Sequence, residues 1–214
     1  MEYIQKKIQH SPTIIALTCK DGLVIFAEKS DEPNKKNFQN HSNMSFLNKI
    51  NLIAGTGLFQ DFNRILERAK MDSIVYRENF STILLGKIFA SRIASLVHLQ
   101  TRYWHIRPLC CSLFLATINS RQPELYMITP TGHFFDCIAG VLGEKSEIFK
   151  ISIDKILQKP LTCKKGVQKI YNLYKKTKKK FNQKHIEVSC FSKDNFSFKI
   201  PVSLNLLQEI HRKN

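Results

Sequence analysis

The chain has 214 residues, of which 43% are hydrophobic, and its 33 Lys and Arg against 17 Asp and Glu give a formal net charge of +16. A chain of this length buries roughly 70% of the surface that it exposes when unfolded, so intrinsic disorder is excluded as its main state and we expect a single domain over residues 1–214. No signal segment and no apolar run of the ~20 residues that a membrane helix needs is found, which predicts no membrane partner.

The positive charge raises the hypothesis of a nucleic-acid partner, because Lys and Arg attract polyanions. The densest run, Lys175–Lys180, follows an amphipathic segment, where lysines also suit a solvated helix C-terminus. Aromatic residues do not alternate with these lysines, as a base-stacking surface would require. The pattern therefore disfavours nucleic acid and favours a solvated face or a localisation signal.

The first part of the chain predicts strands. Glu2–Gln9 is expected to form a short surface helix. Two apolar runs, Thr13–Cys19 and Leu23–Ala27, are separated by Lys20-Asp21-Gly22, which is the turn signal of a β-hairpin. Both runs are almost continuously apolar, which is typical of strands covered on both faces. Ser30–Ser45 is expected to form a loop with at best a weak edge strand, and Ile50–Ala54 a further strand.

Two long helices are predicted next. Apolar residues recur with helical period from Leu58 to about Glu78. Ser81 and Thr82 are expected to cap a second helix that ends before Arg107-Pro108.

The second half repeats this order. An antiparallel meander of three strands is predicted over Leu109–Ile118, Glu124–Ile128 and Phe134–Leu142. Helices follow at Glu147–Leu157 and Thr162–Phe181, with Thr162 as the cap of the second. The last expected elements are strands near His185–Phe191 and Phe196–Ile200 and a short helix from Ser203. Two sheets with a helix pair on each outer face give the most economical packing, so the fold class predicted is α+β, a four-layer α/β/β/α sandwich.

The cysteines and histidines do not form a recognisable site in the sequence. The six cysteines include no C-x-x-C pair, and Cys110 and Cys111 are adjacent, which disfavours a disulfide framework and a zinc site. His105 with Cys110 or Cys111 could be drawn as a catalytic pair, but cysteines in buried strands are usually small apolar residues. The same argument applies to His133, Asp136 and Cys137 as metal ligands. We therefore expect no metal and no cofactor.

Several short strings resemble those of the α-type subunits of the proteasome core particle, a family with the N-terminal-nucleophile hydrolase fold. Met1-Glu2-Tyr3 is similar to the end of the family's Q-V-E-Y-A string. The others, in chain order, are Cys19–Val24 with Ala27-Glu28-Lys29, Gly57–Asp61, Ile106-Arg107-Pro108 and Leu125–Gly132. Each string is weak alone, but their order and spacing match the family over essentially the whole chain. Within it, Leu125-Tyr126-Met127, Leu161-Thr162-Cys163 and Ser203–Glu209 most resemble the subunit at the seventh position of the α ring.

The resemblance implies a function and partners. It implies a structural subunit that binds other α subunits on both sides, β-ring subunits and a regulatory particle or other activator, in ubiquitin-dependent protein degradation in the cytoplasm and nucleus. The family's N-terminal gate tail precedes the Glu-Tyr with which this sequence begins, so we expect no contribution to the pore plug. The alternative is a free-standing basic binding protein of the same fold that contacts nucleic acid or other polyanions.

The resemblance also identifies the family's catalytic places. Catalysis in this fold needs a Thr, Ser or Cys freed at its own N-terminus, supported by an acid and a lysine. Counted from the Asp21-Gly22 hairpin, the nucleophile falls on Pro12, the acid on Glu28 and the lysine on Asn43. Proline has no nucleophilic side chain and Asn43 supplies no cation, so we expect no catalytic residue and no enzyme activity.

Position 43 has a second expected role. In the family, the lysine at this place lies at the floor of a pocket between adjacent α subunits and pairs with the C-terminal carboxylate of an activator. Asn43 would make a neutral hydrogen bond there instead, so the pocket on this subunit is expected to be a weak anchor.

Overall fold

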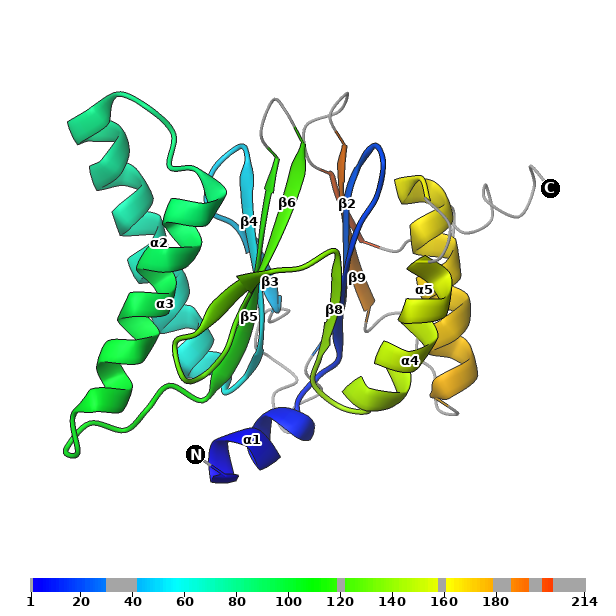
Figure 1. The fold of residues 1–214 in the computed structure, drawn as a ribbon, viewed down its shortest axis with the longest axis horizontal. Helices are drawn as coiled ribbons and strands as arrows, with labels where there is room; N and C mark the ends of the chain where they lie inside the picture. The colour runs from blue at the N-terminus through cyan, green and yellow to red at the C-terminus, as the bar shows by residue number, and fades with distance from the viewer. Residues whose placement is uncertain are drawn as a thin grey trace.

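A computed structural model describes residues 2–29, 42–118, 122–157, 161–178, 186–192 and 198–201, with the backbone alone for 191–192 and 198–201. In this part of the chain two five-stranded sheets lie face to face, and a helix pair covers the outer face of each (Figure 1). The predicted α/β/β/α sandwich is confirmed. The predicted helix from Ser203 and most of the predicted loop Ser30–Ser45 lie outside the described residues.

The first sheet has the strand order β10-β9-β2-β1-β8 and is antiparallel throughout. Its strands are β1 (Ile14–Thr18), β2 (Gly22–Glu28), β8 (Ala139–Leu142), β9 (Ile186–Ser192) and β10 (Phe198–Pro201). Thr18 pairs with Leu23 across the turn, so the predicted β-hairpin at Asp21-Gly22 is confirmed.

The second sheet has the order β3-β4-β5-β6-β7. Its strands are β3 (Met44–Phe46), β4 (Asn51–Gly57), β5 (Cys111–Ile118), β6 (Pro123–Ile128) and β7 (Phe134–Asp136). Strands β5, β6 and β7 form an antiparallel meander, as expected, and β4 pairs antiparallel with β5.

The prediction of one strand over Phe134–Leu142 is wrong. Strand β7 ends at Asp136, and the chain then crosses to the first sheet, where Gly140 of β8 pairs with Ala16 of β1. A Cβ atom at Gly140 would lie 2.7 Å from the Phe114 ring of the other sheet, so the crossing brings a glycine to the place where the two sheets approach closely. Asp136 is the one charged residue between Phe134 and Leu142, and this pattern gave no sign of the crossing.

The helices are α1 (Glu2–Gln9), α2 (Phe59–Phe80), α3 (Gly86–Arg102), α4 (Ser146–Leu157) and α5 (Cys163–Thr177). In Figure 1, α2 and α3 cover the second sheet, α4 and α5 cover the first, and α1 lies at one end of the two sheets. None of the helices in the described ranges is long and apolar enough to cross a membrane.

Three apolar layers hold the sandwich together. One lies between α2, α3 and the second sheet, and includes Phe62 and Phe89. The middle layer joins the two sheets, with Phe114 facing residues of β1 and β2. The third joins the first sheet to α4 and α5 and includes Phe149.

The predicted cap of α3 is wrong. Ser81 is the last residue of the turn that ends α2: it has a left-handed φ of 54°, and its N–H donates to the carbonyl of Arg77. Helix α3 begins only at Gly86, after an extended segment in which the Leu84 carbonyl accepts a buried hydrogen bond from Asn51. A contact with a distant strand therefore sets the start of α3, and the local cap signal does not.

Candidate functional site

The candidate site lies just before β1, where the resemblance places the catalytic nucleophile on Pro12. The Pro12 carbonyl accepts a hydrogen bond of 2.6 Å from the Thr56 hydroxyl. Thr13 is fully buried: its N–H donates to Glu28 Oε2 at 3.1 Å and its hydroxyl donates to the Glu144 carbonyl at 3.1 Å. Because the Thr13 hydroxyl donates to a carbonyl oxygen, this contact provides no base that could take its proton.

Glu28 lies at the end of β2 and forms an ion pair with Lys178, which directly follows α5. Lys178 Nζ donates to both carboxylate oxygens of Glu28, at 2.6 and 2.5 Å, and lies 3.0 Å from Glu144 Oε2. The side chains of Lys178 and Glu28 are only 11% and 20% exposed. The pair is therefore shielded from water and couples the end of α5 to β2.

The protonation of Glu28 reflects these contacts. Burial of the carboxyl raises its pKa, but the hydrogen bonds from Lys178, Tyr174 and the Thr13 N–H lower it, and the net result is a lowered pKa. The carboxylate is thus held in its charged form. A group held charged by a lysine is suited to fixing structure and poorly suited to general-base catalysis near neutral pH.

Asn43, at the family's lysine position, is 6% exposed and its Nδ2 donates to the Glu28 backbone carbonyl at 2.6 Å. The structure thus places Pro12, Glu28 and Asn43 around the start of β1. Glu28 instead receives a cation from Lys178, which directly follows α5 and lies 135 residues beyond Asn43 in the sequence.

The lysine run departs from its prediction at Lys178. The run was expected to face solvent. Lys175 and Lys176 are exposed, but the Lys178 side chain is only 11% exposed and is held in the ion pair. Lys179 and Lys180 lie outside the described residues. The signal that could have found Lys178 is its spacing of four from Tyr174, which places it beside the buried face of α5.

A second polar contact joins two of the strings that resemble the family, Gly57–Asp61 and Ile106-Arg107-Pro108. Asp61, 4% exposed, accepts hydrogen bonds from Arg107 on both carboxylate oxygens, at 2.9 and 2.5 Å, and one from the Cys110 N–H at 2.7 Å. The hydrogen bond to Asp61 is the main cause that raises the pKa of Arg107. The contact joins the first turn of α2 to the entry of β5.

The other candidates from the sequence are not assembled into sites. Cys110 and Cys111 are buried, and burial raises the pKa of both thiols, so they behave as apolar core residues. His133, Asp136 and Cys137 do not form a metal-ligand cluster; among the described residues, the group whose ligand atoms lie within 4.8 Å of one another is Cys19, Asp21 and Cys163.

Comparison with known proteins agrees with this geometry. The family model described as "Proteasome subunit" matches residues 8–191, and the chain belongs to the proteasome subunit family. Its relatives are α-type subunits. The chain is 29% identical to proteasome subunit alpha type-3 of Oryza sativa subsp. japonica, over 95% of this chain and 84% of the relative. It is 27% identical to the probable proteasome subunit alpha type-7 of Schizosaccharomyces pombe, over 97% and 83%. It is 21% identical to the proteasome subunit alpha of Thermococcus sibiricus, over 93% and 76%.

Proposed function

We propose that this chain is a non-catalytic structural subunit of the α ring of the proteasome core particle, acting in ubiquitin-dependent protein degradation. The observation that carries the proposal lies at the nucleophile place itself, which Pro12 occupies. Catalysis in this fold needs a Thr, Ser or Cys there, whereas proline has no nucleophilic side chain, and the Pro12 carbonyl accepts a hydrogen bond from the Thr56 hydroxyl. The α-type relatives named above support the same function, and none of them supports the nucleic-acid alternative.

The partners that we propose are α subunits on both sides, a β-ring subunit and a regulatory particle or other activator. Support for assembly comes from large apolar side chains of α2 and α3 that are 43–58% exposed: Met71, Ile74, Val75, Ile88 and Leu99. Met71, Ile74 and Val75 share one face of α2 at a spacing of three and four residues, and exposed apolar side chains on one helix face are typical of an interaction surface. The seventh position of the ring stays a proposal, carried by the strings around Leu125-Tyr126-Met127 and Leu161-Thr162-Cys163.

We propose the cytoplasm and nucleus as its location. The exposed Lys175 and Lys176 at the end of α5 are compatible with a basic import signal. Replacement of both lysines by Gln in a fluorescently tagged chain should lower its nuclear share if they form such a signal.

Native mass spectrometry of the particle isolated through a tag on this chain tests the proposed function. The expected result is a stoichiometric complex that contains other α-type and β-type subunits. Elution of the chain alone, or with nucleic acid, would support the free-standing basic protein instead.

The weak activator pocket follows from the same proposal. A hydrogen bond to a charged partner is roughly twice as strong as a neutral one, so Asn43 in place of lysine costs about 1–2 kcal/mol, or about tenfold in affinity. The internal bond of its amide to Glu28 is consistent with this expectation. In assembled particles, Asn43→Lys should bind a C-terminal activator peptide about tenfold more tightly, whereas the exposed Gln60→Lys should leave the affinity unchanged.

A further inference from the structure

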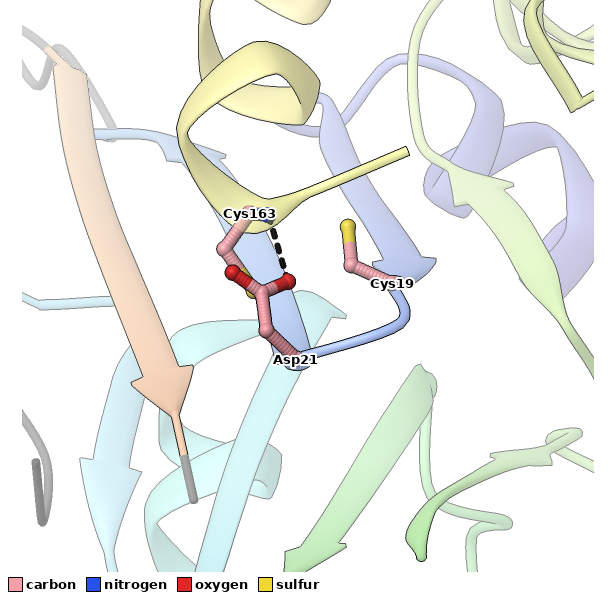
Figure 2. Close-up of side chains that lie close together, drawn as sticks. All are labelled: Cys19, Asp21 and Cys163. Carbon is pink, nitrogen blue, oxygen red and sulfur yellow. Dashed lines mark hydrogen bonds between the residues drawn. The ribbon is translucent and has the colours of Figure 1, made fainter. Parts of the chain in front are cut away.

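A cluster of metal-ligating side chains lies where the β1–β2 turn meets the start of α5. Cys19 and Asp21 come from the turn and Cys163 is the first residue of the helix (Figure 2). The two sulfur atoms and a carboxylate oxygen all lie within 4.8 Å of one another. Cys19 and Cys163 are only 5% and 3% exposed. The function proposed above makes no use of this cluster.

Backbone hydrogen bonds fix the three residues in place. Asp21 Oδ1 accepts the Cys163 N–H at 2.7 Å, which is the dashed contact in Figure 2. The Asp21 side chain therefore caps the N-terminus of α5. This role was predicted for Thr162, whose side chain makes no capping hydrogen bond. The Lys20 N–H donates to the Leu161 carbonyl at 3.0 Å, so the turn and the start of α5 are joined on both sides of the cluster.

A fourth ligand is available on the neighbouring strand. Cys190 lies on β9 opposite Val24 of β2, on the sheet that α5 covers. The Cys163 thiol interacts with the thiols of both Cys19 and Cys190, and Cys190 is also close enough to Asp21 for their charges to interact. Cys190 is not among the three residues whose ligand atoms all lie within 4.8 Å of one another, but its thiol neighbours that of Cys163, so a third thiol is available beside the cluster.

We propose that Cys19, Asp21, Cys163 and Cys190 bind one Zn²⁺ ion. Thiolate ligands favour Zn²⁺ among the abundant divalent cations, and four ligands suit its tetrahedral geometry. With Zn–S bonds of about 2.3 Å, neighbouring ligand atoms of a tetrahedron lie about 3.8 Å apart. The ligand atoms of Cys19, Asp21 and Cys163 therefore need to approach one another by no more than about 1 Å to reach these distances. Each thiol gives its proton to solvent as the metal binds.

The surroundings stabilise the negative charge of such a site. Three thiolates and a carboxylate leave two negative charges after Zn²⁺ is bound. The positive end of the α5 dipole lies at Cys163, and lysines follow Cys19 and Cys163 directly in the chain. The absence of a C-x-x-C pair, which argued against zinc in the sequence, carries no weight against ligands that come from separate segments.

The test is metal binding by the reduced, metal-free full-length chain. Zinc is measured by elemental analysis after dialysis, and Co²⁺ serves as the spectroscopic probe of thiolate coordination. We expect one ion per chain, tetrahedral Co²⁺ absorption bands and a thiolate-to-cobalt charge-transfer band that zinc abolishes. No bound ion under reducing conditions would overturn the proposal, as would a chain that binds no metal but forms a Cys19–Cys163 disulfide on oxidation.

Variants separate this site from adventitious binding. Cys190→Ser is chosen because Cys190 is only partly buried. Loss of one of three thiolates should lower the charge-transfer intensity by about one third and weaken zinc affinity at least tenfold. Cys137→Ser, a partly buried cysteine outside the cluster, is the matched control and should change neither. Equal effects of Cys190→Ser and Cys137→Ser would overturn the assignment.

Discussion

Replacement of Lys178 by Met should destabilise the chain by about 3 kcal/mol at pH 7. The substitution leaves Glu28 buried without its cation, and loss of one partner from a buried ion pair costs about 3–5 kcal/mol. The low end of this range applies because Glu28 is 20% exposed and keeps the Thr13 N–H as a donor. Methionine retains an unbranched apolar stem, so the lost charge accounts for most of the effect.

The effect should also depend on pH. The pKa of Glu28 is lowered in the folded chain, so its contribution is fully present above the unfolded pKa of about 4.3 and is lost as the pH falls through the lower folded value. Without Lys178, burial raises the pKa of Glu28. The variant therefore gains stability by taking up a proton as the pH falls. The difference between wild type and variant should be largest at pH 7 and smaller at pH 4.5.

Urea unfolding of the full-length chain at both pH values measures these free energies. The exposed Lys175→Met is the matched control and should change the free energy of unfolding by less than about 0.5 kcal/mol. The double variant Glu28→Gln/Lys178→Met should be more stable than Lys178→Met, because no unpaired charge remains buried. Equal losses in Lys178→Met and Lys175→Met, or a loss that is the same at both pH values, would refute the reasoning.

Three further substitutions test individual contacts by urea unfolding. Asp61→Ala should cost about 3 kcal/mol, because it removes the buried acceptor of Arg107 and of the Cys110 N–H; a cost below 1 kcal/mol would contradict this. Gly57→Ala should cost about 3 kcal/mol, because Gly57 has a φ of 130° and a Cβ atom would overlap the Cys110 carbonyl oxygen; an unchanged midpoint would argue against that packing. Ser81→Gly should stabilise the chain by about 0.5–1 kcal/mol, because Ser81 has a left-handed φ; a loss of stability would be inconsistent with its place at the end of α2.

The sequence predicted the elements well wherever the signal was local. Asp21-Gly22 fixed the hairpin, and the strand and helix periods gave the four layers. It failed where a distant contact decides the structure. The crossing between Asp136 and Ala139 depends on which sheet has a free edge, and the pattern of apolar residues from Phe134 to Leu142 does not contain that information.

Only part of the candidate site was predicted from the sequence, because the rest also depends on contacts between distant segments. Hairpin register located Pro12, Glu28 and Asn43, and the structure brings them together. Lys178 was missed because a lysine within a basic run resembles its solvated neighbours, and only the position of α5 against β2 shows that it is buried. Asp21 was recognised as a turn residue, but its contact with Cys163 spans more than 140 residues and has no local signature.

The central claim is that the chain is a non-catalytic subunit, in which Pro12 occupies the nucleophile place and the next residue with a hydroxyl, Thr13, is buried. Its most direct test is the intact mass of this chain in isolated particles treated with a peptide electrophile that modifies N-terminal threonine. The account predicts that the chain extends past Pro12 on its N-terminal side and carries no adduct, while catalytic subunits of the same particle are modified. A chain that begins at Thr13 and carries the adduct would contradict it.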